Sequence, residues 1–289
     1  MVLSPLVFVL VLFAAFGHAS WNALVKSGHD PLVTQTYVIG VPGLLCGLAL
    51  FFVPLPDPAS WIFIALSALI HQAYYFLLLT AYRHGDLSQV YPIARGAAPA
   101  LVAVSAWVLV GEALTTSQSV GLAVVCLGIV SFSRALPLPG RKTIRRDGEL
   151  KGIFFALLTA ATIATYSVID GLGVRVSGSA LGYIAWLFFF EAVPLVAVAL
   201  WARRGRLRAA FGVQMKRGIA GGIIAGLAYG IVIWAMGVAP LAHVVALRET
   251  SVIIAALMGT RLLAEPFGAS RLAAAIMVVA GTALLHLSA

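Results

Sequence analysis

Charged residues are scarce in this chain. Of its 289 residues, 10% are charged and 62% are apolar, and only 10 are acidic. Soluble domains carry about 25% charged and about 45–50% apolar residues, so this composition cannot cover a globular surface facing water. It excludes a soluble enzyme, and it excludes a disordered chain, which would combine low hydrophobicity with high charge. The apolar excess must therefore face lipid.

Cysteine and the common cofactor motifs are also scarce or missing. Cys46 and Cys126 both lie in long apolar runs, which argues against a disulfide framework, and no metal-ligand spacing is present. The sequence has neither the glycine-rich loop that cradles ATP phosphates nor a His-Glu-x-x-His metal site. Asp170 begins a run similar to half of an intramembrane aspartyl protease site. The second half is missing and Asp170 falls at a predicted helix end, so we expect no catalytic residues, metal or cofactor.

Long apolar runs dominate the sequence. A helix needs about 20 mainly apolar residues to cross a bilayer. Ten segments fit: Pro5–Leu24, Pro31–Val53, Ser60–Tyr82, Leu87–Val110, Ser117–Ser133, Gly152–Ile169, Gly182–Trp201, Gly218–Gly237, Leu241–Thr260 and Leu272–Leu287. The first has no basic residue before it and is followed by further spans, so we interpret it as a membrane helix and not as a secretory signal. The sequence predicts an all-α integral membrane protein with ten transmembrane helices.

The net charge of +9 is unevenly distributed along these segments. Sixteen of the 19 basic residues fall in loops on one side of the ten-span arrangement, most of them in loops 135–150 and 202–217. Cytoplasmic loops hold the excess of Lys and Arg. We therefore predict that both termini lie outside, that these two loops are cytoplasmic, and that they contact anionic lipid headgroups. The charge indicates orientation, and no nucleic-acid partner is expected.

The two halves of the chain repeat one pattern. Residues 19–24 match residues 164–169 by residue type, and in each half an arginine precedes a glutamate by 17 residues (95 to 112, and 248 to 265). We expect a first five-helix repeat at 1–134, a basic linker at 135–150 and a second repeat at 151–289. Five is an odd number, so the second repeat is inverted. Inverted repeats place a substrate site near the membrane midplane.

These features resemble the EamA-type transporters of the drug/metabolite transporter superfamily. The resemblance lies in the runs His18–Lys26 and Pro92–Gly96, the two helices that end in glutamate, and the five-plus-five layout. It implies a secondary carrier of small metabolites in a bacterial inner membrane, commonly an exporter, that works by alternating access without a cofactor. The rival hypothesis is an intramembrane enzyme or lipid-handling protein that uses the same polar cavity. No matched set of residues supports that rival.

Two arginines within the spans are candidate substrate-binding residues, because ionisable groups in a membrane are costly and commonly functional. Arg95 and Arg248 lie about 10–12 Å into their helices, which enter from opposite faces. A planar guanidinium suits a carboxylate or phosphate, which favours an anionic or zwitterionic cargo. The alternative is that each arginine snorkels or pairs with a structural carboxylate, for which Glu191 and Glu249 are available.

Three more residues are candidates for proton coupling. Glu191 lies in the middle of its helix, where it is either a proton carrier or the partner of Arg95 or Arg248. Glu249 follows Arg248 directly and so points about 100° away round the helix, which means that the two cannot easily share one target and makes Glu249 the weaker candidate. His243, one turn into the same span, serves either cavity lining or packing.

The remaining candidates form polar or aromatic faces toward a cavity. On the first helix, His18 and Asn22 lie on one stripe. They line the cavity or form hydrogen bonds between helices. The other candidate substrate-binding residues are Trp21 on that helix, His71, Gln72 and Tyr75 on the third, and Tyr166 on the sixth.

Overall fold

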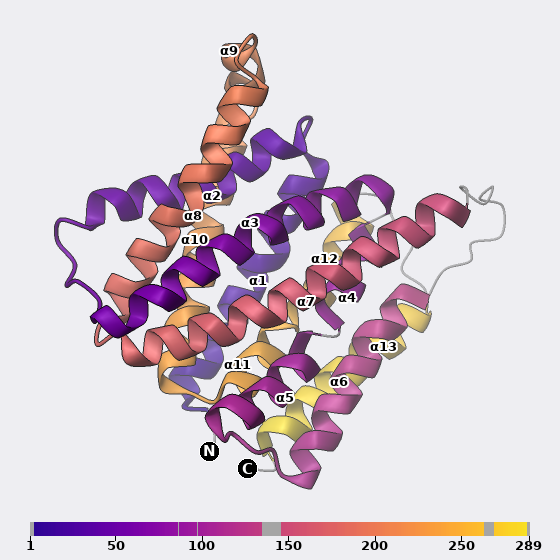
Figure 1. Cartoon of the computed structure of the whole chain (residues 1–289). Helices are drawn as coiled ribbons and strands as arrows, with labels where there is room; N and C mark the ends of the chain where they lie inside the picture. Colours follow the sequence, from indigo (N-terminus) through magenta and orange to yellow (C-terminus); the bar gives the residue numbers. More distant parts are fainter. Residues whose placement is uncertain (1–2, 86, 97, 135–145, 263–268, 288–289) are drawn as a thin grey trace.

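The structure is a computed structural model that describes residues 3–85, 87–96, 98–134, 146–262 and 269–287 (Figure 1). In chain order the helices are α1 (Pro5–Ser27), α2 (Pro31–Ala49), the short 3₁₀ helix η1 (Pro58–Ser60), α3 (Trp61–His84), α4 (Leu87–Gly96), α5 (Ala98–Val110), α6 (Thr116–Arg134), α7 (Arg146–Val176), α8 (Ala180–Ala202), α9 (Leu207–Gly212), α10 (Met215–Val238), α11 (Leu241–Arg248), α12 (Ser251–Leu262) and α13 (Ala269–Leu287). The described residues contain no strand. The all-α prediction is confirmed.

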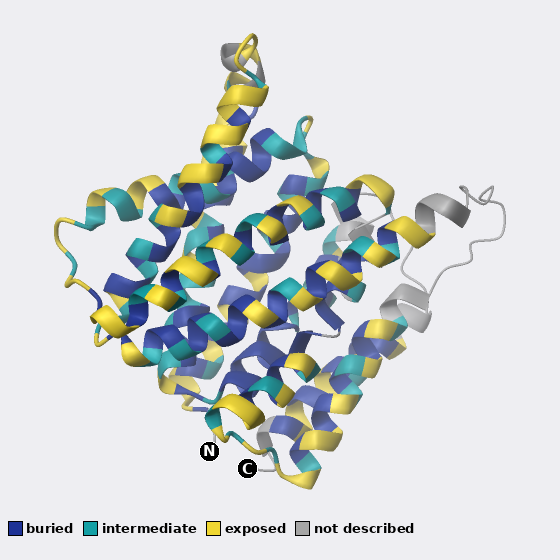
Figure 2. Cartoon of the chain, in the orientation of Figure 1, coloured by how far each residue is buried: buried dark blue, intermediate teal, exposed yellow. Residues whose placement is uncertain are grey.

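The helices have the lengths and surfaces of membrane spans. Within the described residues, seven helical segments are long and apolar enough to cross a membrane, and two shorter apolar helices, Thr116–Ser131 and Ala273–Leu285, add to them. Exposed residues follow the outer faces of the helices (Figure 2), and many of them are large and apolar, such as Phe13, Leu44 and Trp107. An apolar surface this extensive marks a membrane-facing protein. The chain is a multi-pass membrane protein.

Local sequence fixes where several helices begin. Ser4, Asp30 and Ser179 each accept a hydrogen bond from a backbone amide in the first turn of α1, α2 and α8 respectively. Such side-chain caps satisfy amides that have no partner within the helix. Pro5 and Pro31 follow the caps at the start of α1 and α2, where the missing N–H of proline removes no helical hydrogen bond.

The helices of the two halves interleave. α1 packs on α10, α2 on α8, α3 on α7 and α6 on α13, so each of these pairs joins one helix of the first half to one of the second. Exchanging α1 with α7, α2 with α8, α3 with α10 and α6 with α13 turns this set of pairs into itself. The buried residues of Figure 2 accordingly gather between the halves, along these contacts.

Basic residues at corresponding helix ends in the two halves cap the C-terminal ends of equivalent helices. Lys26, at the end of α1, donates to two carbonyls at the end of α3, at 2.7 and 2.9 Å. Arg175, near the end of α7, donates to two carbonyls at the end of α10, at 3.0 and 2.8 Å. The last carbonyls of a helix have no partner within it, and basic side chains satisfy them here. The two halves thus repeat a contact as well as a sequence pattern.

Candidate substrate site

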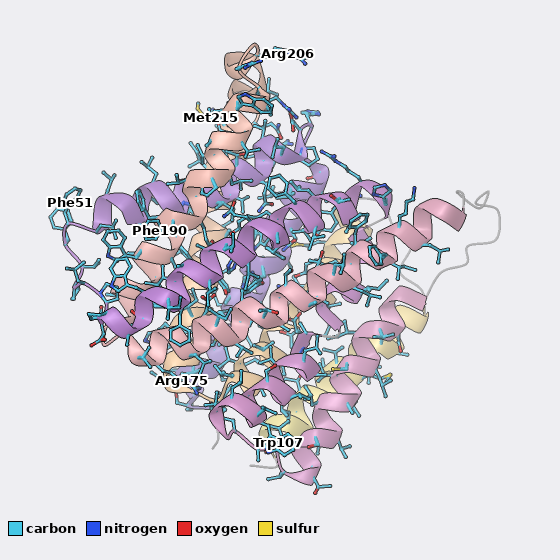
Figure 3. The ribbon with its side chains drawn as sticks, viewed as in Figure 1. Phe51, Trp107, Arg175, Phe190, Arg206 and Met215 are labelled. Carbon is cyan, nitrogen blue, oxygen red and sulfur yellow. The ribbon has the colours of Figure 1, made fainter. Side chains whose placement is uncertain are left out.

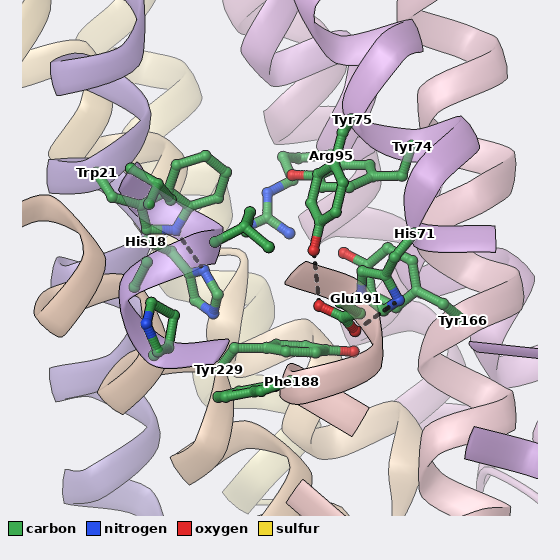
Figure 4. Close-up of a pocket in the computed structure, with 15 residues that line it drawn as sticks. His18, Trp21, His71, Tyr74, Tyr75, Arg95, Tyr166, Phe188, Glu191 and Tyr229 are labelled. Atoms are coloured by element: carbon green, nitrogen blue, oxygen red, sulfur yellow. Dashed lines mark hydrogen bonds and ion pairs between the residues drawn. The ribbon is translucent and has the colours of Figure 1, made fainter. Parts of the chain in front are cut away.

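A cavity lies between the two halves and is lined from α1, α2, α3, α4, α7, α8 and α10 (Figure 4). Leaving the tyrosines aside, four of its lining residues are ionisable: His18, His71, Arg95 and Glu191. Six are other aromatic residues: Trp21, Tyr74, Tyr75, Tyr166, Phe188 and Tyr229. Its volume of about 50 Å³ holds only a few water molecules, each of which needs at least about 10–15 Å³. Side chains or helices must move before an organic molecule can enter.

Glu191 projects into this cavity from the middle of α8. The Tyr75 hydroxyl donates to Glu191 Oε2 at 2.7 Å, and His71 Nδ1 lies 3.1 Å from Oε1. His71 Nδ1 also lies 2.9 Å from the Ser67 carbonyl, which can only accept, so this nitrogen carries the proton. Among the described residues no arginine or lysine pairs with Glu191. The alternative in which Glu191 pairs with Arg95 or Arg248 is therefore wrong for this conformation.

Aromatic rings form the walls around Glu191. The ring of His71 stacks on Tyr166, with 4.0 Å between centroids and planes 27° apart. Phe188 lies nearly parallel to Tyr229, at 6.1 Å and 16°, and Figure 4 shows these two rings together below the carboxylate. Such ring contacts hold flat surfaces in fixed orientations. The cavity therefore offers apolar faces interrupted by a few polar atoms, as small-molecule sites do.

His18 lies on the α1 side of the cavity. The Trp21 indole N–H donates to His18 Nδ1 at 3.2 Å, so Nδ1 is the accepting nitrogen and Nε2 carries the proton. Nε2 is buried and has no hydrogen-bond partner within the described residues. Asn22, one turn further along α1, instead joins α1 to α3, because the Tyr82 hydroxyl donates to its Oδ1 at 2.7 Å. Of the two residues on this stripe, His18 lines the cavity and Asn22 has the packing role.

Arg95 reaches the cavity from the last turn of α4 and joins a buried cluster with Arg248 and Glu249. Glu249 Oε1 lies 3.3 Å from Arg95 Nη1 and 3.2 Å from Arg248 Nη2. Arg248 and Glu249 are completely buried, and Arg95 is 3% exposed. One carboxylate thus serves two guanidiniums, which leaves the cluster with one excess positive charge. Arg248 Nη1 has no hydrogen-bond partner among the described residues.

A helix break places two of these charges. The predicted span Leu241–Thr260 is interrupted at Glu249 and Thr250, which form a turn between α11 and α12. Because the helix ends at Arg248, the 100° separation of an unbroken helix does not apply. The Arg248 and Glu249 side chains instead turn toward each other, with Arg248 Nη2 3.2 Å from Glu249 Oε1. Arg248 occupies the last turn of the short helix α11, where the helix dipole favours a positive charge.

Asp170, which the sequence places at a predicted helix end, is a buried carboxylate. It lies inside α7, six residues before the helix ends, and is completely buried. Tyr183 donates to Oδ1 at 3.0 Å and Tyr229 to Oδ2 at 2.5 Å. Since Tyr229 also lines the cavity, Asp170 stands directly behind the cavity wall. The signal that could have found it was its position within an apolar helix, three residues after the last polar residue of the repeated motif.

The other predicted site residues lie away from the cavity surface. Gln72 donates to the Glu191 carbonyl at 3.0 Å and so joins α3 to α8. His243 Nε2 lies 3.4 Å from Gln118 Nε2, among α5, α6 and α13, and does not line the cavity. Asn22, Arg248 and Glu249 are buried beside or behind the lining residues. The structure brings Arg95, His18, His71, Trp21, Tyr75, Tyr166 and Glu191 together around one space, and it adds Tyr74, Phe188 and Tyr229.

The arrangement can recognise separated charges on one small molecule. Arg95 offers guanidinium donors, which suit a carboxylate or phosphate, and His18 offers a neutral N–H. Glu191 offers a carboxyl group that can accept from an amine or hold a proton. Among the described residues, no three His, Cys, Asp or Glu side chains meet in a way that could hold a metal ion.

Comparisons with known proteins agree with this architecture. A solved crystal structure of another protein is similar over 97% of this chain and 99% of its own, with a TM-score of 0.69 and 20% sequence identity, which supports the fold alone. A search of curated proteins gave no match. The sequence matches the EamA-like transporter family twice, over residues 5–134 and 150–287, once in each half. Because these matches span most of the sequence, the chain belongs to the EamA-like transporter family.

Proposed function

We propose that this chain is a secondary transporter that carries a small organic anion or zwitterion across the membrane by alternating access. The observation that carries the proposal is the cavity enclosed between the two repeats, with Arg95 and Glu191 facing the same space. Inverted-repeat carriers bind their cargo at such an interface and expose it to each side in turn. The small volume of the cavity suits an intermediate in which neither side is open to cargo.

The helices support ten crossings in two inverted repeats. In this arrangement α11 with α12 forms one broken crossing, α4 and α5 belong to the equivalent crossing of the first repeat, and α6 and α13 complete the two sets of five. Discontinuous helices are where such carriers bind substrate and coupling ions. The repeats are 1–134 and 151–289, joined by the basic linker 135–150. Residues 135–145 of that linker lie outside the described residues.

We place the protein in a bacterial inner membrane with both termini outside. Arg206, in the basic loop 202–217, lies at the end of the molecule away from Arg175 (Figure 3). This is the separation expected if one end holds the cytoplasmic basic residues. Anionic headgroups would then contact the basic loops. We propose that the small-molecule cargo is exported, because the family resemblance implies an exporter.

A binding screen followed by a transport assay tests the proposal. Purified protein is screened by thermal shift against amino acids, organic acids and phosphate esters, and each stabilising compound is then measured by counterflow in proteoliposomes. We expect Arg95→Gln to abolish counterflow of the compounds that bind, while Arg83→Gln, at the exposed end of α3, leaves it unchanged. Equal counterflow by wild-type protein and Arg95→Gln would overturn the anion site. Stabilisation without any counterflow would favour the rival enzyme or lipid-handling function.

A further inference from the structure

Among the described residues, the buried Asp, Glu and Arg side chains are Arg95, Asp170, Glu191, Arg248 and Glu249, and the charge balance below counts these five, with the buried histidines as neutral imidazoles. Three of them form the cluster with one excess positive charge described above. Asp170 and Glu191 differ from that cluster in their surroundings. Their nearest donors are the Tyr183, Tyr229 and Tyr75 hydroxyls and His71, and no described Arg or Lys forms an ion pair with either.

The two carboxyl groups belong to one connected polar network. His71 contacts Glu191 through Nδ1, and the same nitrogen lies 3.2 Å from the Ser67 hydroxyl, which faces Asp170. Tyr229, which donates to Asp170 Oδ2, also has its ring 5.5 Å from the ring of His71, so one chain of contacts joins the two carboxyl groups. Interacting carboxyl groups in a site of low polarity do not ionise independently, because the second negative charge is repelled by the first.

The charge balance of the buried core selects one ionisation state. With both carboxyls ionised, the five side chains sum to one negative charge, and with both protonated they sum to one positive charge. With one ionised they sum to zero. A net charge buried in a membrane is costly, so the neutral state is favoured. We propose that Asp170 and Glu191 form a paired-carboxyl site that holds one exchangeable proton in the cargo-free protein.

The groups that surround this site are consistent with a single shared proton. The side chains that contact Asp170 or Glu191 are His71, Tyr75, Tyr183 and Tyr229, and the further groups that act on the two carboxyls are Cys46, Ser67, Tyr166 and Arg248. Arg248 is the only permanently charged group in this set, and its charge is already shared with Glu249. The hydroxyl donors stabilise one carboxylate by hydrogen bonds without supplying the charge that a second carboxylate would need.

The paired-carboxyl site also determines how many protons move with each cargo molecule. This part of the inference rests on the proposed function. A cargo carboxylate bound at Arg95 adds one negative charge to the buried core. Charge balance then favours uptake of one proton from water onto the remaining carboxylate, which forms a second carboxylic O–H. When the cargo leaves, that proton returns to water on the side where the cargo is released. One proton therefore accompanies each anionic charge.

Infrared spectroscopy of the purified full-length protein tests the paired site without cargo or transport. At neutral pH we expect a carboxylic C=O band from one protonated group in wild type, and loss of this band in both Asp170→Asn and Glu191→Gln. In either variant the remaining carboxyl must ionise to balance the cluster. Arg248→Gln removes one positive charge, so charge balance requires both carboxyls to be protonated. We expect the carboxylic C=O band of this variant to double in intensity. Glu112→Gln, whose carboxylate pairs with Arg175 and not with a group of the paired site, leaves the band unchanged.

Other outcomes would overturn the shared proton. Loss of the band in only one of the two carboxyl variants would show an independent proton on that residue. A wild-type protein without the band, or a band that survives in both variants, would exclude a single shared proton. Since no transport is measured, failure of the carrier proposal in the counterflow assay is distinguishable from failure of the paired site.

Discussion

Glu249 Oε1 lies 3.3 Å from Arg95 Nη1, so a charge of the second repeat meets a charge of the first inside the membrane-spanning region. The same oxygen is 3.2 Å from Arg248 Nη2. Because Arg248 is completely buried and Arg95 is 3% exposed, water cannot replace this carboxylate. The cluster therefore ties the broken span α11–α12 to α4 at the level of the cavity.

We expect Glu249→Gln to be the most destabilising single change in the cluster. It leaves two buried guanidiniums without a counter-charge, and breaking a buried ion pair in this way costs about 3–5 kcal/mol. Arg95→Gln costs less, because Glu249 keeps Arg248. The free energy of unfolding is measured by SDS titration of mixed micelles. The double variant should lose less than the sum of the single losses, by about 0.5–3 kcal/mol; strictly additive losses would contradict the shared carboxylate.

The double variant Asp170→Asn/Glu191→Gln is expected to remove the response of transport to a pH gradient. The amides keep oxygens for the tyrosine hydroxyls but can no longer carry a proton. Counterflow without a gradient should persist, because the cavity keeps its shape, while a proton gradient no longer accelerates uptake. Tyr75→Phe is the control, since it removes a hydrogen bond of Glu191 and leaves both carboxyl groups able to carry a proton. A pH response retained by the double variant would contradict proton coupling through these two carboxyls.

Glu112 and Arg175 connect the two repeats at one end of the molecule. Glu112 Oε1 lies 2.6 Å from Arg175 Nη1, and Oε2 accepts from the backbone N–H of Leu241 at 2.8 Å. Opening the cavity at this end must separate these elements. We therefore expect Glu112→Gln to favour the state open at this end by about two- to fivefold, the range of a partly exposed ion pair.

Cysteine labelling measures this opening. A single cysteine introduced as Phe188→Cys, in a protein whose two native cysteines are replaced by alanine, reports access to the cavity by a membrane-impermeant maleimide. The labelling rate from the Arg175 end should rise in Glu112→Gln. Asp30→Asn, which breaks the pair at the other end of α8, should not raise it. Equal rates in wild type and Glu112→Gln would exclude a gating role for the ion pair.

Much of the architecture could be predicted because hydrophobicity is a strong signal in a membrane. The apolar segments, the two repeats, and the placement of Arg95, His71 and Glu191 at one cavity follow from polar residues in otherwise apolar runs. The break after Arg248 could not be predicted in this way. No glycine or proline marks it, and the apolar pattern continues into α12. The broken helix is stabilised by tertiary contacts of the charged cluster, which local sequence does not encode.

The aromatic wall of the site was harder to predict for a different reason. Phe188 lies three residues before Glu191 on the same face of α8, but Tyr229 is an ordinary residue of an apolar helix that only tertiary packing brings beside Glu191. Asp170 lies one residue beyond the predicted span Gly152–Ile169, so the sequence does not mark it as buried. In the structure α7 continues to Val176, which buries the carboxylate among tyrosines from α8 and α10. Helix length, and not residue type, accounts for this difference.

Stability should depend on pH through Asp30, which lies outside the spans and pairs with Arg203 at 2.7 Å. Partial burial alone would raise the pKa of the Asp30 carboxyl, but hydrogen bonds from Arg203 and from two backbone amides bring this pKa below its ordinary value. The pKa is therefore lower in the folded than in the unfolded chain. The ionised carboxylate stabilises the fold above the unfolded pKa of about 3.9, and this stabilisation is lost as the pH falls through the folded-state pKa.

Thermal unfolding at several pH values tests this dependence. At neutral pH we expect Arg203→Gln, which keeps the helix cap, to be less stable than wild type by about 0.5–1 kcal/mol, as for a partly exposed ion pair. The difference should close at pH values below the folded-state pKa, because the protonated carboxyl has no charge to pair. Arg206→Gln, an exposed neighbour on the same loop, should match wild type throughout. A difference that stays constant down to acid pH would mean that Arg203 stabilises the protein by packing and not through the charge of Asp30.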